Sequence, residues 1–448
     1  MTENKYLIVA RCGKSSLHEH WTTGSRKNFD LLLCSYESVT GCDDSEIIKS
    51  YKWHALYQFF LTNTAWRSYD YICMPDDDIL ADSDTWSIFF DRCRDLEAAL
   101  AAPALTPNSY FSHVITLQNE AFKARATTFV EIMTPCMSRE FLEEALTTLL
   151  LQKLGAGYGL DFVWPYILGF KDIWIIDETP VRHTRPVGSN YSRAYRQSMK
   201  YDLLLIKGFG IPWEMRSVGG YTISDDYISA EDVDFDATLR RGYSYVQGMH
   251  PNRWKEIENL KGGARPEPDP EALKRLGNAL SHISLGDSTI SRGKPCLVSS
   301  VFPGSWSDDP AVEATGGNDG LLNGAYGFHT NWEVDPWWQV DLLSEHEISS
   351  IILYNWLGFK KRCIDLDVHV SADGQKWRTI HRKRDGVQFG GLDGFPLRIA
   401  LASPERGRIV RIQACGKTFL HLDQVEIFGN EIHNNSTFRK LLRMTLKI

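Results

Sequence analysis

The sequence predicts two domains of different class, an α/β layered domain followed by an all-β sandwich. Residues 1–254 alternate short apolar runs with helical stretches, which is the pattern of an α/β domain. Residues 255–285 are dominated by charge, glycine and proline and are interpreted as a linker, with a short helix over 271–281. Residues 286–430 contain short strand-like segments separated by turns, which favours a sandwich.

Three apolar runs of the first domain have the length of buried parallel strands, at residues 6–10, 29–34 and 69–74. Residues 47–61 have the apolar spacing of a helix, and residues 173–176 form a later strand. In the second domain the predicted strands cover residues 348–354, 365–371, 409–413 and 425–428.

Composition narrows the class of protein. The chain has 448 residues and a formal net charge of −8, which argues against a nucleic-acid partner. No run approaches the roughly 20 apolar residues that span a bilayer. The first residues lack the features of a secretory signal, and the nine cysteines are scattered without a CxxC pair. We therefore expect a cytoplasmic protein with reduced thiols.

An acidic triplet, Asp76-Asp77-Asp78, follows the strand at 69–74 directly. Adjacent carboxylates repel one another, and a divalent cation with its preference for oxygen ligands explains them most simply. Ligands of open α/β sheets bind beyond the carboxyl ends of the strands, which is where the triplet falls. The alternative is a solvated acidic turn.

The triplet belongs to a series of segments in fixed order: Val9-Ala-Arg-Cys-Gly-Lys-Ser-Ser-Leu-His18, Tyr51-Lys-Trp-His-Ala-Leu56, Tyr69-Asp-Tyr-Ile-Cys-Met-Pro-Asp-Asp-Asp-Ile79, Val130-Glu-Ile-Met-Thr-Pro-Cys-Met-Ser138 and Gly157-Tyr-Gly-Leu-Asp-Phe-Val-Trp164. Over residues 4–200 the series resembles a glycosyltransferase-like family that was long catalogued only as a domain of unknown function. The resemblance implies the GT-A fold, a Rossmann-like mixed sheet, and a DxD motif that holds Mn²⁺ or Mg²⁺ against the diphosphate of a nucleotide-sugar donor.

The resemblance also implies roles for single residues. It assigns Asp78 to the metal and Asp76 to the ribose or to the metal's water shell. A third ligand commonly arrives late in such domains, and His183 follows the strand at 173–176; a plain surface histidine is the alternative. Asp161 is the candidate general base, with a helix N-cap after Gly159 as the alternative. Glu131 is the second candidate base, and for it a buried ion-pair role is equally open.

Further candidates would contact the nucleotide or its diphosphate: Arg11, Lys14 and Ser15 after the first strand, Lys52, and Arg182 with Arg185 beside His183. A loop with a glycine and hydroxyls can hold phosphate, although no Walker motif is present. Lys52 would reach the diphosphate as a point charge, or it is an exposed helix lysine.

The second domain carries its own ordered motifs: Asn318-Asp-Gly-Leu-Leu-Asn323, His329-Thr-Asn-Trp332, Pro336-Trp-Trp-Gln-Val-Asp-Leu342, Val368-His-Val-Ser-Ala-Asp-Gly374 with Trp377, and Leu422-Asp-Gln-Val-Glu-Ile-Phe-Gly429. Over residues 286–430 they resemble the discoidin, or coagulation factor 5/8 type C, domain, and most closely its fucose-lectin branch. The resemblance implies a jelly-roll sandwich that displays glycan-binding loops and often holds a structural Ca²⁺.

Asp319 matches the calcium loop, and Glu426 lies near the second acidic ligand, although Gln424 occupies the more usual position. The lectin branch binds sugar with a histidine and two arginines. Here His329, Arg362 and neighbouring Lys361 remain as candidates, while Trp356 stands where the first arginine is expected. Trp356 would stack on a sugar or cap the sandwich.

Residues 431–448 form a basic tail with Arg439, Arg443 and Lys447 spaced as on one helix face. Such a helix binds anionic membrane surfaces, here the inner face of the membrane, or docks on its own protein.

The function predicted from these features is metal-dependent glycosyl transfer from a nucleotide-diphosphate sugar to a hydroxyl of a polysaccharide or glycolipid, with a C-terminal glycan-binding module. Two alternatives stay open: a non-catalytic glycan-binding or adhesion protein with an inactive GT-A-like domain, and a metal-dependent phosphohydrolase. The phosphohydrolase is disfavoured because no second carboxylate cluster offers a two-metal site. Donor, acceptor, stereochemistry and oligomeric state are not determined by the sequence.

Overall fold

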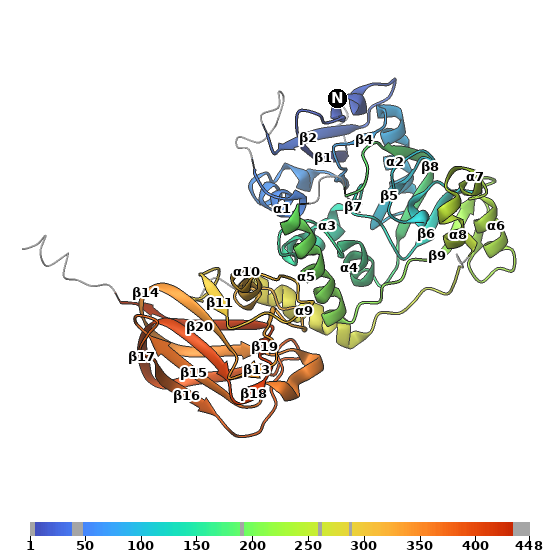
Figure 1. Ribbon diagram of the computed structural model, residues 1–448. Coiled ribbons are helices and arrows are strands. Elements are labelled where there is room, and N and C mark those ends of the chain that lie inside the picture. The colour runs from blue at the N-terminus through green and yellow to red at the C-terminus, as the bar shows by residue number, and fades with distance from the viewer. Residues whose placement is uncertain (1–4, 38–47, 189–191, 259–261, 286–288, 433–448) are drawn as a thin grey trace, which may run out of the picture. The chain divides into compact units, whose positions relative to one another are not determined.

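The computed structural model describes residues 5–37, 48–188, 192–258, 262–285 and 289–432. These residues divide into two compact units, 1–274 and 275–448, and the division falls inside the predicted linker (Figure 1). The basic tail over 436–448 lies outside the described residues. No helix of the described part is both long enough and apolar enough to cross a bilayer.

The first unit contains one large mixed sheet with helices on both faces. Its strands and helices are, in chain order, β1 (Tyr6–Cys12), β2 (Phe29–Ser35), α1 (Lys52–Thr62), β3 (Tyr71–Cys73), β4 (Ile79–Leu80), α2 (Ser83–Asp95), β5 (Leu100–Leu105), β6 (Phe122–Thr127), β7 (Cys136–Ser138), α3 (Arg139–Ala145), α4 (Leu160–Ile167), β8 (Ile173–His183), α5 (Arg193–Phe209), β9 (Ser217–Thr222), β10 (Tyr227–Ser229), α6 (Phe235–Arg241), α7 (Val246–Met249) and α8 (Trp254–Glu258). Helix α9 (Pro270–Leu285) then spans the division between the units.

The sheet order is β10-β9-β6-β8-β5-β7-β3-β1-β2, and β4 pairs with β8. Strand β1 runs parallel to both β2 and β3, whereas β7 is antiparallel to β3 and β5. The α/β prediction for this part of the chain is therefore confirmed at the level of a mixed sheet covered by helices.

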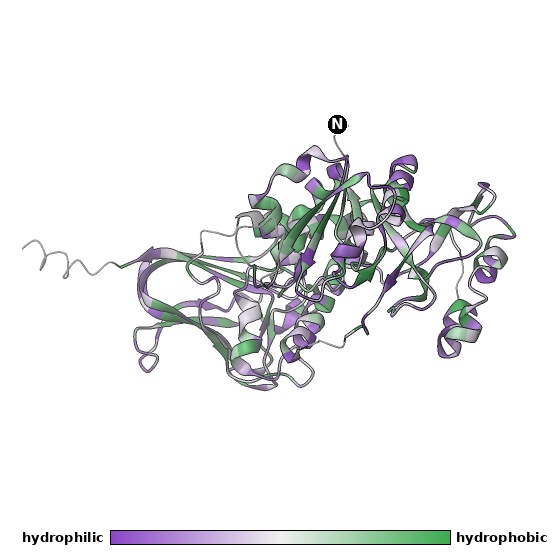
Figure 2. Ribbon diagram, turned by 90° about the horizontal axis from the view of Figure 1, so that it is seen from above, coloured by the Kyte–Doolittle hydropathy of each residue, from purple (hydrophilic) through white to green (hydrophobic). Residues whose placement is uncertain are grey.

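Strand β1 shows why its sequence is a continuous apolar run. Tyr6, Ile8 and Ala10 join one buried cluster, which includes the aromatic side chains of α2. Leu7 and Val9 join a second cluster with apolar residues of α1, α3 and α4. A strand buried on both faces has no polar side to alternate with. Figure 2 shows the same concentration of apolar residues in the strands.

Strand β8 is much longer than the predicted strand at 173–176. It continues through polar residues because Asp177 is fully buried in an ion pair with Arg125 on β6, with Arg125 Nε and Asp177 Oδ2 2.8 Å apart. This extension carries the strand to His183. The predicted helix at 271–281 corresponds to α9, which begins one residue earlier and ends four residues later.

The second unit is an all-β sandwich. Its elements are β11 (Cys296–Val298), α10 (Pro310–Ala314), β12 (Phe328–His329), β13 (Glu333–Val334), β14 (Trp337–Tyr354), the 3₁₀ segment η8 (Leu357–Arg362), β15 (Leu366–Ser371), β16 (Arg378–Lys383), β17 (Leu397–Ala414), β18 (Lys417–Thr418), β19 (His421–Leu422) and β20 (Gln424–Glu431). Strands β11, β14, β17, β15, β16 and β20 form the main sheet, and β12–β19 and β13–β18 form two short ones.

The core of this unit lies between the main sheet and the short β12–β19 pair. Phe328 of β12 stacks on Trp338 of β14, with ring centroids 5.8 Å apart. Trp338 is fully buried, and its indole Nε1 donates to the Ala314 carbonyl at 2.9 Å. All four predicted strands fall within β14, β15, β17 and β20, apart from Asp365 at the edge of β15. Strand β15 alternates buried and partly exposed residues along most of its length, as expected for a sandwich, whereas residues 425–427 of β20 are all buried.

Candidate functional site

The acidic triplet lies just beyond β3, next to the end of β1, and its three side chains have different environments. Asp77 holds the surrounding loops together. Its Oδ2 accepts from the Gly13 N–H at 3.2 Å and from the Tyr36 hydroxyl at 2.7 Å, and its Oδ1 pairs with Arg185 Nη1 at 3.1 Å. Asp77 is therefore a structural carboxylate that joins three separate segments.

Asp78 is paired with the predicted third ligand, His183. Strand β4 pairs with β8 so that Ile79 lies opposite His183, and this brings Asp78 Oδ2 to 3.2 Å from His183 Nε2. The other ring nitrogen, Nδ1, lies 2.7 Å from the Tyr110 carbonyl. Burial lowers the pKa of His183, but the hydrogen bond and charge of Asp78 outweigh it, so that the pKa is raised overall. His183 is buried, so the surface-histidine alternative is wrong.

Asp76 forms an ion pair with Lys52, the first residue of α1. Lys52 Nζ lies 2.6 Å from Asp76 Oδ1 and 2.9 Å from the Ile132 carbonyl. The Lys52 side chain is only 15% exposed, so the exposed-lysine alternative is wrong. The backbone N–H of Asp76 donates to the Met133 carbonyl at 2.8 Å, which fixes the triplet against the segment that carries Glu131.

These groups line one cleft of about 530 Å³, a size typical of ligand sites. Asp76, Asp78, Glu131, Asp161 and His183 all contribute to its wall. One oxygen in each of three carboxyls, Asp78 Oδ1, Glu131 Oε2 and Asp161 Oδ1, is buried without a hydrogen-bond partner. Unpartnered buried polar atoms are costly, so a group of them in one cleft indicates a ligand site.

Burial shapes the acidity of the two candidate bases. It raises the pKa of Glu131 to about 7, opposed by a hydrogen bond with Ser112 and the charge of His183. It also raises the pKa of Asp161 well above its usual value, and the charge of Glu131 adds to this rise. Each carboxyl thus favours its protonated form, and Glu131 titrates near neutral pH.

The local structure corrects one expectation about these carboxyls and places the other in a loop. Gly159 is the N-cap residue of α4, and Asp161 is the second residue of the helix, so the N-cap reading of Asp161 is wrong. Glu131 follows β6 in a loop and not in a strand. Within the described part of the chain no cation pairs with Glu131, and its Oε2 has no hydrogen-bond partner.

A smaller cavity of about 300 Å³ adjoins this cleft and shares Tyr51, Lys52, Asp76 and Asp78 with it. Arg11 lines it, but its guanidinium is already engaged. Nη1 donates to the Ser35 carbonyl at 2.7 Å, and Nη2 donates to the carbonyls of Ile48 and Ser50 at 2.6 and 3.1 Å. Arg11 therefore ties β2 to the segment before α1, and its predicted nucleotide contact is wrong in this arrangement.

The other predicted nucleotide contacts differ in whether their side chains line the cleft. The Lys14 side chain is exposed, and Ser15 accepts from Arg185 Nη2 through its carbonyl at 2.6 Å. Arg182 is exposed and alternates with His183 along β8, so its side chain points to the opposite face and the Arg182 prediction is wrong. Arg185 is the arginine that lines the cleft.

The donor set suits a hard divalent cation, although the described residues form no ready-made site. In the described residues, no three histidine, cysteine or acidic side chains converge as metal ligands. Asp78 has a free oxygen beside His183, and oxygen with imidazole is a set that Mn²⁺ accepts. A metal here would compete with Lys52 for Asp76. Metal binding by Asp76, Asp78 and His183 therefore stays a prediction, and the chemistry of these side chains is compatible with it.

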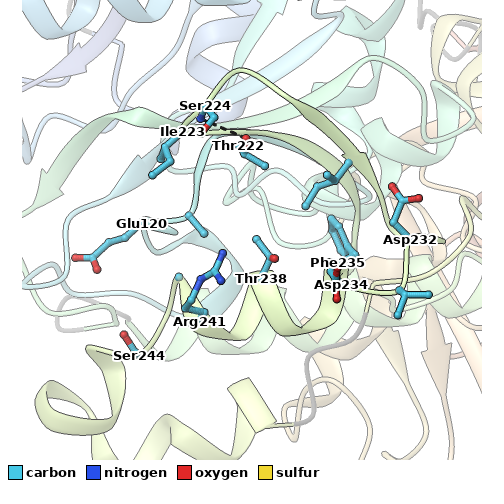
Figure 3. Close-up of a pocket in the computed structure, with 14 residues that line it drawn as sticks. Glu120, Thr222, Ile223, Ser224, Asp232, Asp234, Phe235, Thr238, Arg241 and Ser244 are labelled. Carbon is cyan, nitrogen blue, oxygen red and sulfur yellow. Dashed lines mark hydrogen bonds between the residues drawn. The ribbon is translucent and has the colours of Figure 1, made fainter.

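A second, larger cavity of about 770 Å³ lies between the β9–β10 hairpin and α6 (Figure 3). Glu120, Thr222, Thr238 and Arg241 line it, and none of the sequence-predicted residues does. Its lining residues contribute no buried polar atom that lacks a partner within the described chain. It offers volume without the chemical features of the first cleft.

In the second unit, the predicted glycan residues come together in an aromatic cluster. The cluster comprises Phe302, Tyr326, His329, Trp332, Trp356, Phe359, Phe419 and His421. His329 and Trp356 lie with ring centroids 6.0 Å apart. The Arg362 guanidinium lies over Phe359 at 4.1 Å and over Phe419 at 5.0 Å. Trp332 is the exposed tryptophan of the cluster, at 51%.

The histidines of the cluster are neutral. Burial lowers the pKa of His329 to about 4, only partly opposed by its hydrogen bond to the Thr330 carbonyl. Burial also lowers the pKa of His421, and the neighbouring His329 ring and the Arg362 guanidinium disfavour a second proton there. With Nδ1 of His329 directed at the Thr330 carbonyl, at 2.7 Å, the other ring nitrogen is left as an acceptor.

The predicted calcium ligands do not form one site. Glu426 Oε2 accepts from the Tyr354 hydroxyl at 2.9 Å, whereas Oε1 lies 3.1 Å from His282 Nε2, a buried ring nitrogen without a hydrogen-bond partner. Asp319 accepts from the Leu321 N–H. The carboxyl facing this loop is Asp423, which accepts from the Gly324 N–H at 2.8 Å. The calcium role of Asp319 and Glu426 therefore stays a prediction, and Asp423, within a motif that the sequence analysis recognised, was not among the predicted ligands.

Comparisons with known proteins bear on the second unit. A family model described as NedA-like, galactose-binding domain, of F5/8 type C, matches residues 314–412. The comparison with curated proteins gave no match. The family match does not extend to the first unit, whose GT-A-like fold stays a prediction.

Several solved structures match about a third of the chain. A fucose binding module of Streptococcus pneumoniae is 23% identical, with 32% of this chain and 97% of that chain covered and a TM-score of 0.26. The lectin domain of lectinolysin complexed with Lewis B antigen is 28% identical, with 32% and 96% covered and a TM-score of 0.25. A fucolectin from striped bass serum is 21% identical, with 33% and 49% covered and a TM-score of 0.27. The family model and the observed sheets together make the C-terminal region a discoidin-like, F5/8 type C β-sandwich.

Proposed function

We propose that the first unit is a metal-dependent glycosyltransferase, which moves a sugar from a nucleotide-diphosphate donor to a hydroxyl of a polysaccharide or glycolipid. One observation carries the proposal: two polar pairs, Lys52–Asp76 and Asp78–His183, share a cleft with two buried carboxyls, Glu131 and Asp161. Binding of an anionic ligand and deprotonation of a hydroxyl both have suitable groups there.

The donor's diphosphate belongs at the end of the cleft that holds positive charge. Lys52 and Arg185 both line this region, and the adjoining cavity of about 300 Å³ leaves space beside the triplet. A bound Mn²⁺ or Mg²⁺, held by Asp76, Asp78 and His183, would supply Lewis-acid stabilisation of the leaving group. Lys52 and Arg185 add fixed positive charge in the same place.

The proton of the acceptor hydroxyl would go to Glu131. Its Oε2 is unpartnered, and its pKa of about 7 suits a base that works near neutral pH. Asp161 favours its protonated form, because burial and the charge of Glu131 both oppose its ionisation. It would therefore position the hydroxyl as a hydrogen-bond donor while Glu131 takes the proton.

A thermal-shift measurement on the full chain tests donor binding. We expect a nucleoside diphosphate with Mn²⁺ to raise the unfolding midpoint, since a ligand at about 100 times its Kd stabilises by about 2.7 kcal/mol. Asp78→Asn should remove the Mn²⁺-dependent part of the shift and abolish metal-dependent turnover. Arg185→Ala should weaken nucleotide binding, whereas Arg182→Ala, the matched control on the opposite face, should not.

The proposal fails if no nucleoside diphosphate shifts the midpoint in the presence of Mn²⁺, or if Asp78→Asn behaves as the unmodified chain does. The first result would favour a non-catalytic glycan-binding protein.

We also propose that the second unit binds glycans at the aromatic cluster. The F5/8 type C match and the named ligands of the fucose-binding structures motivate this. Trp332 and Phe359 offer exposed rings, and Arg362 lies between Phe359 and Phe419. Sugar C–H faces pack on such rings while hydroxyls meet polar groups.

A glycan array on the full chain tests this second proposal. We expect Trp332→Ala to reduce binding about tenfold, equivalent to ~1.4 kcal/mol. Phe395→Ala is the matched control, because Phe395 is an exposed aromatic residue of the same unit outside the cluster. Equal loss in both variants, or no binding by the unmodified chain, would refute a glycan site at the cluster.

A further inference from the structure

An exposed tryptophan lies at the cleft of the first unit and has no role in the reaction proposed above. Trp213 lies in the segment between α5 and β9, and its side chain is 41% exposed. Its ring packs on Phe162, with centroids 4.1 Å apart and an interplanar angle of 30°, and on Tyr158 at 5.7 Å. Trp213 and Tyr158 both line the cleft.

The packing fixes this ring relative to the candidate catalytic carboxyls. Phe162 follows Asp161 directly in the first turn of α4, so the helix that positions Asp161 also supports the indole. The charge of Glu131 acts on Asp161, and the charges of His183 and Asp76 act on Glu131. The same cleft is lined by Asp76 and Asp78 of the triplet, by Glu131 and Asp161, and by Tyr158 and Trp213, which form its aromatic wall.

Two parts of the cleft suit different ligand chemistry. Lys52 and Arg185, beside the triplet, attract a phosphate-bearing ligand. The aromatic wall holds no cation among the described lining residues and adjoins two carboxyls, so a phosphate is disfavoured there. A sugar ring has an apolar C–H face for an indole and hydroxyls for the unpartnered oxygens of Glu131 and Asp161.

We propose that Trp213, with Tyr158, is the platform on which the acceptor saccharide binds, with one hydroxyl directed at Glu131 and Asp161. This inference rests on the proposed transferase function and names the acceptor class, a pyranoside with an exposed C–H face. Trp213 is a positioning and specificity residue, since it holds the acceptor and exchanges no proton.

The first test needs no activity. The full chain is treated with N-bromosuccinimide, which oxidises exposed indoles, and oxidation at each tryptophan is measured by peptide mass spectrometry. The probes are methyl glycosides of galactose, glucose, mannose and N-acetylglucosamine, each with a nucleoside diphosphate and Mn²⁺. We expect at least one glycoside to protect Trp213 severalfold, and the partly exposed Trp254, which lies outside both the cleft and the aromatic cluster, to serve as the internal control.

The proposal is overturned if no glycoside protects Trp213, or if the nucleoside diphosphate alone protects it, which would place the indole in the donor site. Failure of the transferase proposal gives a different result, namely no Mn²⁺-dependent thermal shift by any nucleoside diphosphate. The two failures are thus separate.

The second test is kinetic. We expect Trp213→Ala to raise the acceptor KM about tenfold or more, while the Mn²⁺-dependent thermal shift by a nucleoside diphosphate is retained. Trp213→Phe should recover most of the acceptor affinity, because it keeps an aromatic face. An unchanged acceptor KM in Trp213→Ala, with transfer intact, would overturn the platform.

Discussion

The cleft of the first unit and the aromatic cluster of the second respond to burial in opposite ways. In the cleft, burial raises the pKa of Glu131 and Asp161 and favours carboxyls that hold a proton. In the cluster, burial lowers the pKa of His329 and His421 and favours imidazoles that have lost one. Both environments select the uncharged form.

The two regions differ in which buried polar atoms lack a hydrogen-bond partner: carboxyl oxygens in the cleft, and the imidazole nitrogen Nε2 of His421 in the cluster. The cleft retains buried carboxyl oxygens without partners and ion pairs that a ligand could enter. The cluster consists of rings in mutual contact, and His329 directs one nitrogen at a backbone carbonyl. The first arrangement suits bond-making chemistry with proton transfer, and the second suits recognition of a surface by packing.

The largest expected effect concerns Glu131. Glu131→Gln keeps the shape of the side chain and removes the base, so we expect transfer to fall by roughly 10²- to 10⁴-fold. Folding stability should not fall, because a buried carboxyl with an unpartnered oxygen is replaced by a neutral amide. Glu120→Gln, an exposed glutamate of the second cavity, is the control. Full activity of Glu131→Gln would remove the residue from the mechanism.

A smaller effect is expected in the dependence of stability on pH. The pKa of Glu131 rises from 4.5 to about 7 on folding, so its contribution is complete below pH 4.5 and is lost as the pH rises to 7. The pKa of His329 falls from 6.5 to about 4, so its contribution is complete above pH 6.5 and is lost as the pH falls to 4. Each contribution is on the order of 1–3 kcal/mol.

Between pH 4.5 and 6.5, therefore, raising the pH should weaken the first unit and strengthen the second through these groups. Urea unfolding followed by pulse proteolysis, with peptides assigned to each unit, measures both. Glu131→Gln and His329→Gln should flatten the profile of their own unit only. Profiles that change in the same direction in the two units would contradict the comparison.

The elements that the sequence predicted correctly are those with a regular pattern of burial along the strand. Strand β1 was recognised because both of its faces are covered, and β15 because its faces alternate. Strand β8 was truncated because Asp177 reads as polar, and only the distant Arg125 on β6 makes its burial acceptable. A long-range ion pair leaves no local pattern along the chain.

The candidate site was predicted in part, for a related reason. The acidic triplet and His183 were found through motifs, and the structure brings them together. The choice between Arg182 and Arg185 depends on which face of β8 each side chain occupies, and the engagement of Arg11 depends on carbonyls more than 20 residues away. Trp213, a single aromatic residue between α5 and β9, carries no recognisable signal by itself.

Asp77 has a consequence for any mutational survey of the triplet. Because its carboxylate joins the loop after β1, the Tyr36 hydroxyl and the Arg185 guanidinium, removing it would release three segments at once. An assay of activity alone would then not distinguish Asp77 from Asp76 and Asp78, although the role of Asp77 is structural. Folding stability and activity must be measured separately to distinguish Asp77, which holds the loops around the cleft together, from Asp76 and Asp78, which are the predicted metal ligands.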